Sequence, residues 1–135
     1  MKFTIKYCLV SAVTLLIGIT SSHIAVAENQ QGAFSGMWKA SESDGLIINA
    51  EDDGREISAE VYSGGFDHYI KGNHQSYARA NVVVTRKNIN NNCVTKMYAT
   101  WTLINPNQFR SQVKGTDGRC DLPTNFQEVR IFNRE

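Results

Sequence analysis

Apolar and polar residues alternate along most of the chain from residue 34 onward. Ile57, Ala59 and Val61 alternate with polar neighbours, and residues 96–103 and 109–114 repeat the pattern. Near the end of the chain, Val129 and Ile131 occupy the corresponding apolar positions. A period of two residues is typical of strands that turn one face inward and the other toward water. No helical period follows residue 27, so the sequence predicts an all-β fold.

Short clusters rich in Gly, Asn, Asp and Ser separate the alternating segments, as in Ser43-Asp44-Gly45 and Asn105-Pro106-Asn107. Eight short antiparallel strands with such spacing favour a small up-and-down β-barrel, because closure leaves no exposed strand edge. A β-sandwich of seven or eight strands is the alternative. The expected strands are residues 34–41, 45–50, 55–62, 67–72, 76–87, 93–104, 108–115 and 126–133.

The first 27 residues have the features of an export signal. Lys2 and Lys6 precede an apolar run from Cys8 to Ile19, and Ala25-Val26-Ala27 supplies a small-residue cleavage site. We expect cleavage after Ala27 and a periplasmic or secreted protein. A retained membrane anchor or a buried helix is the alternative. The mature chain, residues 28–135, is expected to be one barrel domain, with residues 28–33 as a mobile leader.

The charge of the mature chain argues against nucleic acid as a partner. Without Lys2 and Lys6, the 14 basic residues fall to 12 against 13 acidic ones, a net charge of −1. Phosphate binding requires a concentrated basic excess, which this composition does not provide. The mature chain has no apolar segment of transmembrane length, so we expect no membrane span in it.

Two cysteines, Cys93 and Cys120, remain after cleavage. In an oxidising compartment such a pair most simply forms one disulfide. Closing this loop stabilises the fold by about 3.5 kcal/mol in the chain-entropy model. A metal-binding pair or a catalytic thiol is the alternative, although no histidine is near either cysteine in the sequence.

The segment Phe34-Ser35-Gly36-Met37-Trp38, followed by turns and by strand residues 57–62, resembles the opening of the calycin barrels, the group of lipocalins and avidins. In spacing it is most similar to the avidin branch. The resemblance implies that Trp38 closes one end of the barrel while a basic residue of the last strand packs across it. Arg130 and Arg134 both fit that role.

The ligand residues of avidins are mostly absent. Avidins place an Asn soon after the Gly-x-Trp, where this chain has Ala40, and Ser41 and Ser43 are only near the position of the avidin serine. Tyr62 and Ser63 fit a tyrosine and a hydroxyl of the next strand. The resemblance therefore implies the architecture without biotin as the ligand.

No constellation of residues indicates catalysis, so we expect no enzyme activity, no metal and no cofactor. His68 and His74 are too far apart on an extended segment to favour a metal site, and are expected to be exposed beside a turn. Residues 51–53 lack the ligand spacing of a calcium loop and are expected to form a hairpin turn.

Two functions remain, and they belong to different classes. The first is a non-catalytic binding protein whose barrel holds a small apolar or amphipathic ligand. Its walls would be the aromatic residues Trp38, Tyr62, Tyr69 and Trp101. The alternative is a periplasmic inhibitor or immunity protein that blocks a hydrolase or toxin, another extracytoplasmic protein, through a rigid loop.

Overall fold

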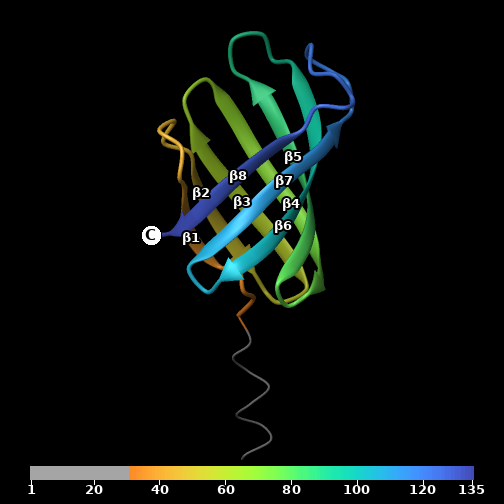
Figure 1. Cartoon of the computed structure of the whole chain (residues 1–135). Coiled ribbons are helices and arrows are strands. Elements are labelled where there is room, and N and C mark those ends of the chain that lie inside the picture. Colours follow the sequence, from red (N-terminus) through yellow and green to blue (C-terminus); the bar gives the residue numbers. More distant parts are fainter. Residues whose placement is uncertain (1–30) are drawn as a thin grey trace, which may run out of the picture. The chain divides into compact units, whose positions relative to one another are not determined.

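The computed structural model describes residues 31–135. The predicted signal segment, its cleavage site and residues 28–30 lie outside this range. Among the described residues, no helix is long and apolar enough to cross a membrane. The strands are β1 (Gly36–Ala40), β2 (Ile47–Asp52), β3 (Glu56–Ser63), β4 (Phe66–Ser76), β5 (Arg79–Asn88), β6 (Val94–Asn105), β7 (Gln108–Thr116) and β8 (Glu128–Arg134) (Figure 1).

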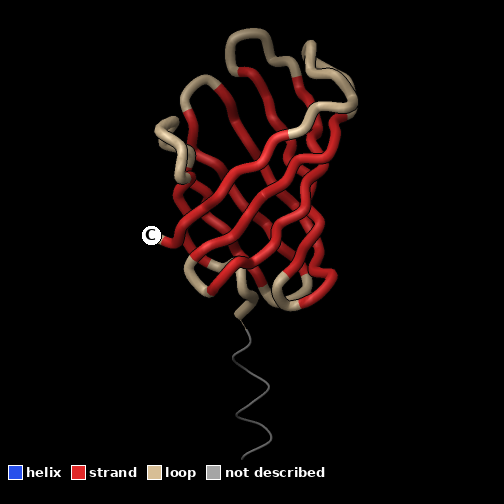
Figure 2. Tube along the Cα trace, in the orientation of Figure 1, coloured by secondary structure: helices blue, strands red, loops and turns tan. Residues whose placement is uncertain are grey.

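The eight strands form a closed antiparallel barrel in sequence order. Closure occurs between β1 and β8, where Trp38 is paired with Arg134 and Ala40 with Phe132. The predicted barrel is therefore confirmed, and the alternative of a sandwich is wrong. This architecture is consistent with a calycin-like fold. Strands and loops alternate around the wall, with loops gathered at its two ends (Figure 2).

The predicted disulfide is present and distinguishes the two ends. Cys93, in the β5–β6 loop, is bonded to Cys120, in the β7–β8 loop, with a Cα–Cα distance of 5.9 Å. We call the end that carries these loops and the β1–β2 and β3–β4 loops the disulfide end. The opposite end, with the β2–β3, β4–β5 and β6–β7 hairpins, is the base.

Strand β4 is longer than the sequence predicted. The expected break near Gly72 does not occur, and β4 continues to Ser76 before the chain turns at residues 77–78. A Cβ atom at Gly72 would lie 2.5 Å from the backbone oxygen of Asn81 on β5. Gly72 therefore permits a close approach of two strands rather than a turn.

The inward face of β8 is also the opposite of the predicted one. Phe132 is buried inside the barrel, and Val129 is exposed on the outer wall. Glu128 and Arg130 face inward like Phe132, because side chains two and four residues apart lie on the same face of a strand. The last strand thus directs two charged residues toward the interior at the disulfide end.

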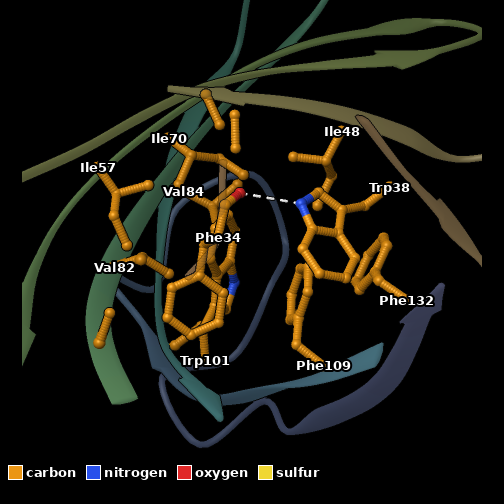
Figure 3. Close-up of a cluster of buried hydrophobic side chains, with 14 of the residues drawn as sticks. Phe34, Trp38, Ile48, Ile57, Ile70, Val82, Val84, Trp101, Phe109 and Phe132 are labelled. Carbon is orange, nitrogen blue, oxygen red and sulfur yellow. Dashed lines mark hydrogen bonds between the residues drawn. The ribbon is translucent and has the colours of Figure 1, made fainter. Parts of the chain in front are cut away.

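Aromatic side chains fill the interior at the base. Phe109 lies at their centre, with ring centroids 4.8 Å from Trp38, 4.7 Å from Trp101 and 5.0 Å from Phe132. Phe34 adds an edge-to-face contact with Phe109 at 5.5 Å. All five rings are almost completely buried, and Figure 3 shows them converging from several strands. Such packing leaves this part of the barrel solid.

Arg134 seals the base from outside this aromatic cluster. Its guanidinium lies 4.1 Å from the centre of the Trp38 ring and donates hydrogen bonds to the backbone oxygens of Ala33, Ser35 and Pro106. The Trp38 indole in turn donates to the Phe34 oxygen at 2.9 Å (Figure 3). One cation thereby joins the start of the barrel, the β6–β7 hairpin and the last strand.

Gly36 allows this arrangement. It adopts φ +115°, in the left-handed region that favours glycine, and an added Cβ would lie 2.9 Å from the Arg134 guanidinium. The Gly-x-Trp spacing thus has a physical basis, since glycine gives the arginine access to the tryptophan two residues later.

The prediction of a mobile leader is wrong for residues 32 and 33. Ala33 is buried, its oxygen accepts a hydrogen bond from Arg134, and Gly32 donates its backbone N–H to the Asp52 oxygen at 3.0 Å. Residues 32–34 therefore form a plug at the base, because their backbone groups are tied to β2 and β8.

Replacing Trp38 tests whether the barrel depends on this base. We expect Trp38→Ala to lower the free energy of unfolding by about 3–5 kcal/mol, because it leaves a cavity and removes the surface on which Arg134 lies. Tyr77→Ala, on the exposed β4–β5 turn, should change it by less than about 0.5 kcal/mol. Urea denaturation followed by circular dichroism measures both. A loss below about 1 kcal/mol for Trp38→Ala would contradict this role.

Candidate functional site

The four aromatic residues predicted to form a ligand wall do not come together. Trp38 and Trp101 lie inside the barrel, whereas Tyr62 and Tyr69 are 55% and 45% exposed on its outer face. Tyr62 follows the inward Val61, and Tyr69 precedes the inward Ile70. The prediction of a common wall is therefore wrong, because the two-residue period places these tyrosines on the opposite face.

Trp38 and Trp101 do not line an open cavity either. Trp101 is packed against Phe34 and Phe109, with centroid distances of 5.6 and 4.7 Å. Both tryptophans are buried at the solid base and serve as core. Any ligand that enters the barrel must therefore do so at the other end.

The two arginines proposed for the closure lie at opposite ends. Arg134 covers Trp38 at the base, as described above. Arg130 points inward at the disulfide end, where it forms ion pairs with Asp44 and, at 2.8 Å, with Glu128. These carboxylates, with desolvation opposing them, raise the pKa of Arg130 above its ordinary value. Arg130 is therefore a cation whose charge is offset by neighbouring carboxylates, and it is not part of the base.

A buried acid–histidine pair lies beside the plug. The His74 Nε2 atom is 2.7 and 2.8 Å from the two carboxylate oxygens of Asp52, and the side chains are 7% and 0% exposed. Asp52 also accepts hydrogen bonds from the backbone N–H groups of Phe34 and Gly54. The His74 Nδ1 atom is 2.8 Å from the Ser76 oxygen.

This pair holds the base together and has no access to a substrate. Both imidazole nitrogens are already engaged, and Phe34 covers the His74 ring at 5.6 Å. The prediction that His74 is exposed is therefore wrong, whereas the predicted turn is present between Asp52 and Glu56, and Asp52 has the additional role of binding His74. Within residues 31–135, no three His, Cys, Asp or Glu side chains are grouped to bind a metal.

The interior changes character toward the disulfide end. There the inward positions carry aliphatic side chains such as Val61, Val84 and Met97, which are buried. Their cross-strand partners Ile48 and Ile70 are each 2% exposed. The interior toward the disulfide end therefore has an aliphatic floor, whereas the base is aromatic.

Nearer the rim of the disulfide end than these aliphatic residues, the inward positions carry aromatic and cationic side chains. His68 on β4 is directly paired with Arg86 on β5, and Phe66 follows at the next inward position. The Arg86 guanidinium lies 4.7 Å from the centre of the Phe66 ring. The three side chains are only partly buried, so they remain open to solvent and to a ligand.

His68 is uncharged at neutral pH. Desolvation is the largest cause that lowers its pKa to about 4, followed by repulsion from Arg86, while Asp67 opposes and Arg130 adds to the shift. Its Nδ1 atom lies 3.5 Å from the Ser63 hydroxyl. His68 is thus a neutral polar group paired with Arg86 across the sheet.

A hollow of about 240 Å³ continues from Arg86 to the disulfide. Its walls come from the paired loops and from the adjacent ends of β4, β5 and β6. They are formed by Phe66, Arg86, Asn88, Asn91, Cys93, Thr95, Cys120 and Asp121. We call this hollow, together with the aliphatic interior below it, the cup.

The sequence predicted no site role for Arg86 or Asp52. Arg86 follows Ala80, Val82 and Val84 at intervals of two. That parity was the available signal for an inward arginine. No comparable signal existed for Asp52, because its partner His74 lies 22 residues away.

No protein-family model matches the chain, and no curated protein matches it. Among solved structures, the chain is similar to EF1p2_mFAP2b bound to DFHBI, with 16% identity and a TM-score of 0.47. The match covers 76% of this chain and 94% of that chain. This degree of similarity assigns neither a family nor a ligand.

Replacing Asp52 tests the pair at the base. We expect Asp52→Asn to destabilise the fold by about 3 kcal/mol, because His74 loses its carboxylate and an amide N–H group would face backbone donors. The adjacent acidic residue provides the control, since Glu51 is exposed and Glu51→Gln should cost less than about 0.5 kcal/mol. Equal thermal stability of the two variants would contradict the assigned role.

The low pKa of His68 predicts a pH-dependent loss of stability. Between pH 6.5 and about 4, histidine binds a proton in the unfolded chain but not in the folded protein. The contribution of His68 to the free energy of unfolding is therefore fully present above pH 6.5, and it is lost as the pH falls toward 4. After allowance for solvent screening, the wild type should lose about 1–2 kcal/mol more than His68→Gln between pH 7 and 5. Parallel urea titrations measure this difference, and identical losses would contradict it.

Proposed function

We propose that the protein is a non-catalytic binding protein that holds a small amphipathic ligand in the cup. The observation that carries the proposal is the contrast between the two halves of the barrel interior. The base is solid with aromatic rings, whereas the disulfide end has an aliphatic floor and, above it, a hollow of about 240 Å³ with polar side chains in its lining. A site with an apolar floor and a few polar groups at its mouth is typical of small-molecule binding.

The polarity of the cup supports an amphipathic ligand over a purely apolar one. Val61, Val84 and Met97 offer apolar contact, while Arg86 and His68 offer polar contact at the rim. An eight-stranded barrel has room for side chains and at most one small ligand. We therefore propose a ligand whose apolar part enters the barrel and whose polar part stays at the rim.

The proposed setting is outside the cytoplasm. It depends on the export signal predicted in residues 1–27 and fits the Cys93–Cys120 disulfide, because such bonds persist in oxidising compartments. We propose no catalytic role, since the acid–histidine pair of the described chain is buried and the partly exposed His68, whose Nδ1 lies 3.5 Å from the Ser63 hydroxyl, has no carboxylate bonded to it.

One observation favours a protein inhibitor as a second candidate. The disulfide joins two loops, and Cys120 and Asp121 adopt positive φ values of 58° and 61°. Loops constrained in this way can be preorganised for a protein partner. In that case the cup would need no occupant.

Native mass spectrometry of the mature protein purified from its own host tests the main proposal. We expect a small-molecule adduct that is lost on denaturation. Val84→Phe should abolish the adduct, because the larger side chain fills the cup. Val83→Phe is the matched control, since Val83 is the next residue on β5 but faces outward, and its adduct should remain.

Circular dichroism and thermal unfolding verify that both variants are folded. An unmodified chain in every preparation would reject the ligand-binding proposal and favour the protein inhibitor. Retention of the adduct by folded Val84→Phe would place the ligand elsewhere and contradict the cup as its site.

A further inference from the structure

Arg86 differs from the other inward-facing arginine at the disulfide end. Arg130 is paired with Asp44 and Glu128, but no carboxylate of the described residues lies within 4.0 Å of the Arg86 guanidinium. Asp121 lines the same hollow without reaching that distance. A partly buried guanidinium carries five N–H donors and a full charge, so it favours an anionic partner.

The neighbouring amides add donors rather than acceptors. The side-chain oxygen of Asn88 already accepts the backbone N–H of Asn90, and that of Asn91 accepts the N–H of Cys93, each at 2.9 Å. These bonds leave the amide N–H₂ groups of Asn88 and Asn91 to donate. Thr95 likewise donates its hydroxyl to Asp117. The lining of the hollow is therefore rich in hydrogen-bond donors around one cation.

The register of β4 and β5 gives this cluster a direction. Phe66 is paired with Asn88, one inward position nearer the rim than His68 and Arg86, and its ring lies against the Arg86 guanidinium. On the other side of Arg86, the next inward pair of the same two strands is Ile70 and Val84. A molecule with its charged group at Arg86 can thus direct its apolar part away from the rim, toward Ile70 and Val84.

We propose that Arg86 is the specificity-determining residue of the cup and binds the anionic oxygen group of a singly charged amphiphile. The inference rests on the proposed function and deepens it by assigning the class of ligand. Arg86 supplies charge and paired N–H donors, with Phe66 against its guanidinium, Asn88 and Asn91 supply further donors, and the apolar part of the ligand contacts the aliphatic floor.

Two fluorescent probes that differ in a single group test the proposal. Anilinonaphthalenesulfonate is anionic, and N-phenylnaphthylamine is the same scaffold without the sulfonate. We expect the wild type to bind both and to bind the sulfonate more tightly. Arg86→Gln should weaken sulfonate binding by about tenfold to a hundredfold and leave binding of the neutral probe within about twofold.

Lys87→Gln is the matched control, because it removes the same charge one residue away on the exposed outer face. It should leave the affinities for both probes within about twofold. Arg86→Lys keeps the charge without the planar fork and should retain part of the preference for the sulfonate. Thermal unfolding of each variant establishes that it is folded.

The outcomes separate this inference from the proposed function. If Arg86→Gln weakens neither probe or both equally, or if Lys87→Gln has the same effect, the role of Arg86 is overturned while ligand binding stands. If the wild type binds neither probe, the assigned ligand class is overturned, and native mass spectrometry decides the broader function independently.

Discussion

The contact between Arg134 and Trp38 is the interaction on which the rest of the barrel depends. It joins the first strand to the last, so it coincides with the closure of the sheet. A cation over an indole contributes about 0.5–2 kcal/mol by itself. Its larger effect is geometric, because the same guanidinium accounts for three backbone oxygens from separate segments. The aromatic core lies where these segments meet.

The base provides much of the stability of the fold, and the disulfide end provides the proposed binding site. At the base, the plug, the Asp52–His74 pair and five aromatic rings fill the interior of the barrel. At the disulfide end there is a hollow of about 240 Å³, and the Arg86 guanidinium beside it has no carboxylate partner among the described residues. A partly buried charge without a counterion lowers stability, and the solid base and the disulfide offset that cost. The proposed site therefore lies where the fold depends least on close packing.

Charge is distributed unevenly within the cup. Arg130 has three carboxylate partners, His68 is neutral, and Arg86 has an aromatic face beside it but no carboxylate partner among the described residues. The net charge of the mature chain, near zero, gives no indication of this local arrangement. A binding preference that depends on one guanidinium is invisible in composition, because it arises from which charges face one another across the barrel.

The sequence by itself determined the all-β class, the approximate strands, the disulfide and the Gly-x-Trp with a basic partner on the last strand. These features depend on local period, turn chemistry and cysteine number, which can be read within short windows. The sequence-based prediction placed Tyr62 and Tyr69 in the ligand wall because they are aromatic, although their strand positions face outward. It also reversed the inner and outer faces of β8, because both faces of that strand carry apolar residues.

Only the tertiary structure decided which arginine covers Trp38, that Asp52 meets His74, and that Arg86 and Arg130 face the same interior with different partners. Such pairings join residues distant in the chain, and they are set by the register of the closed sheet. A shift of one residue in any strand would exchange its inner and outer faces, so the proposed site exists only once that register is established.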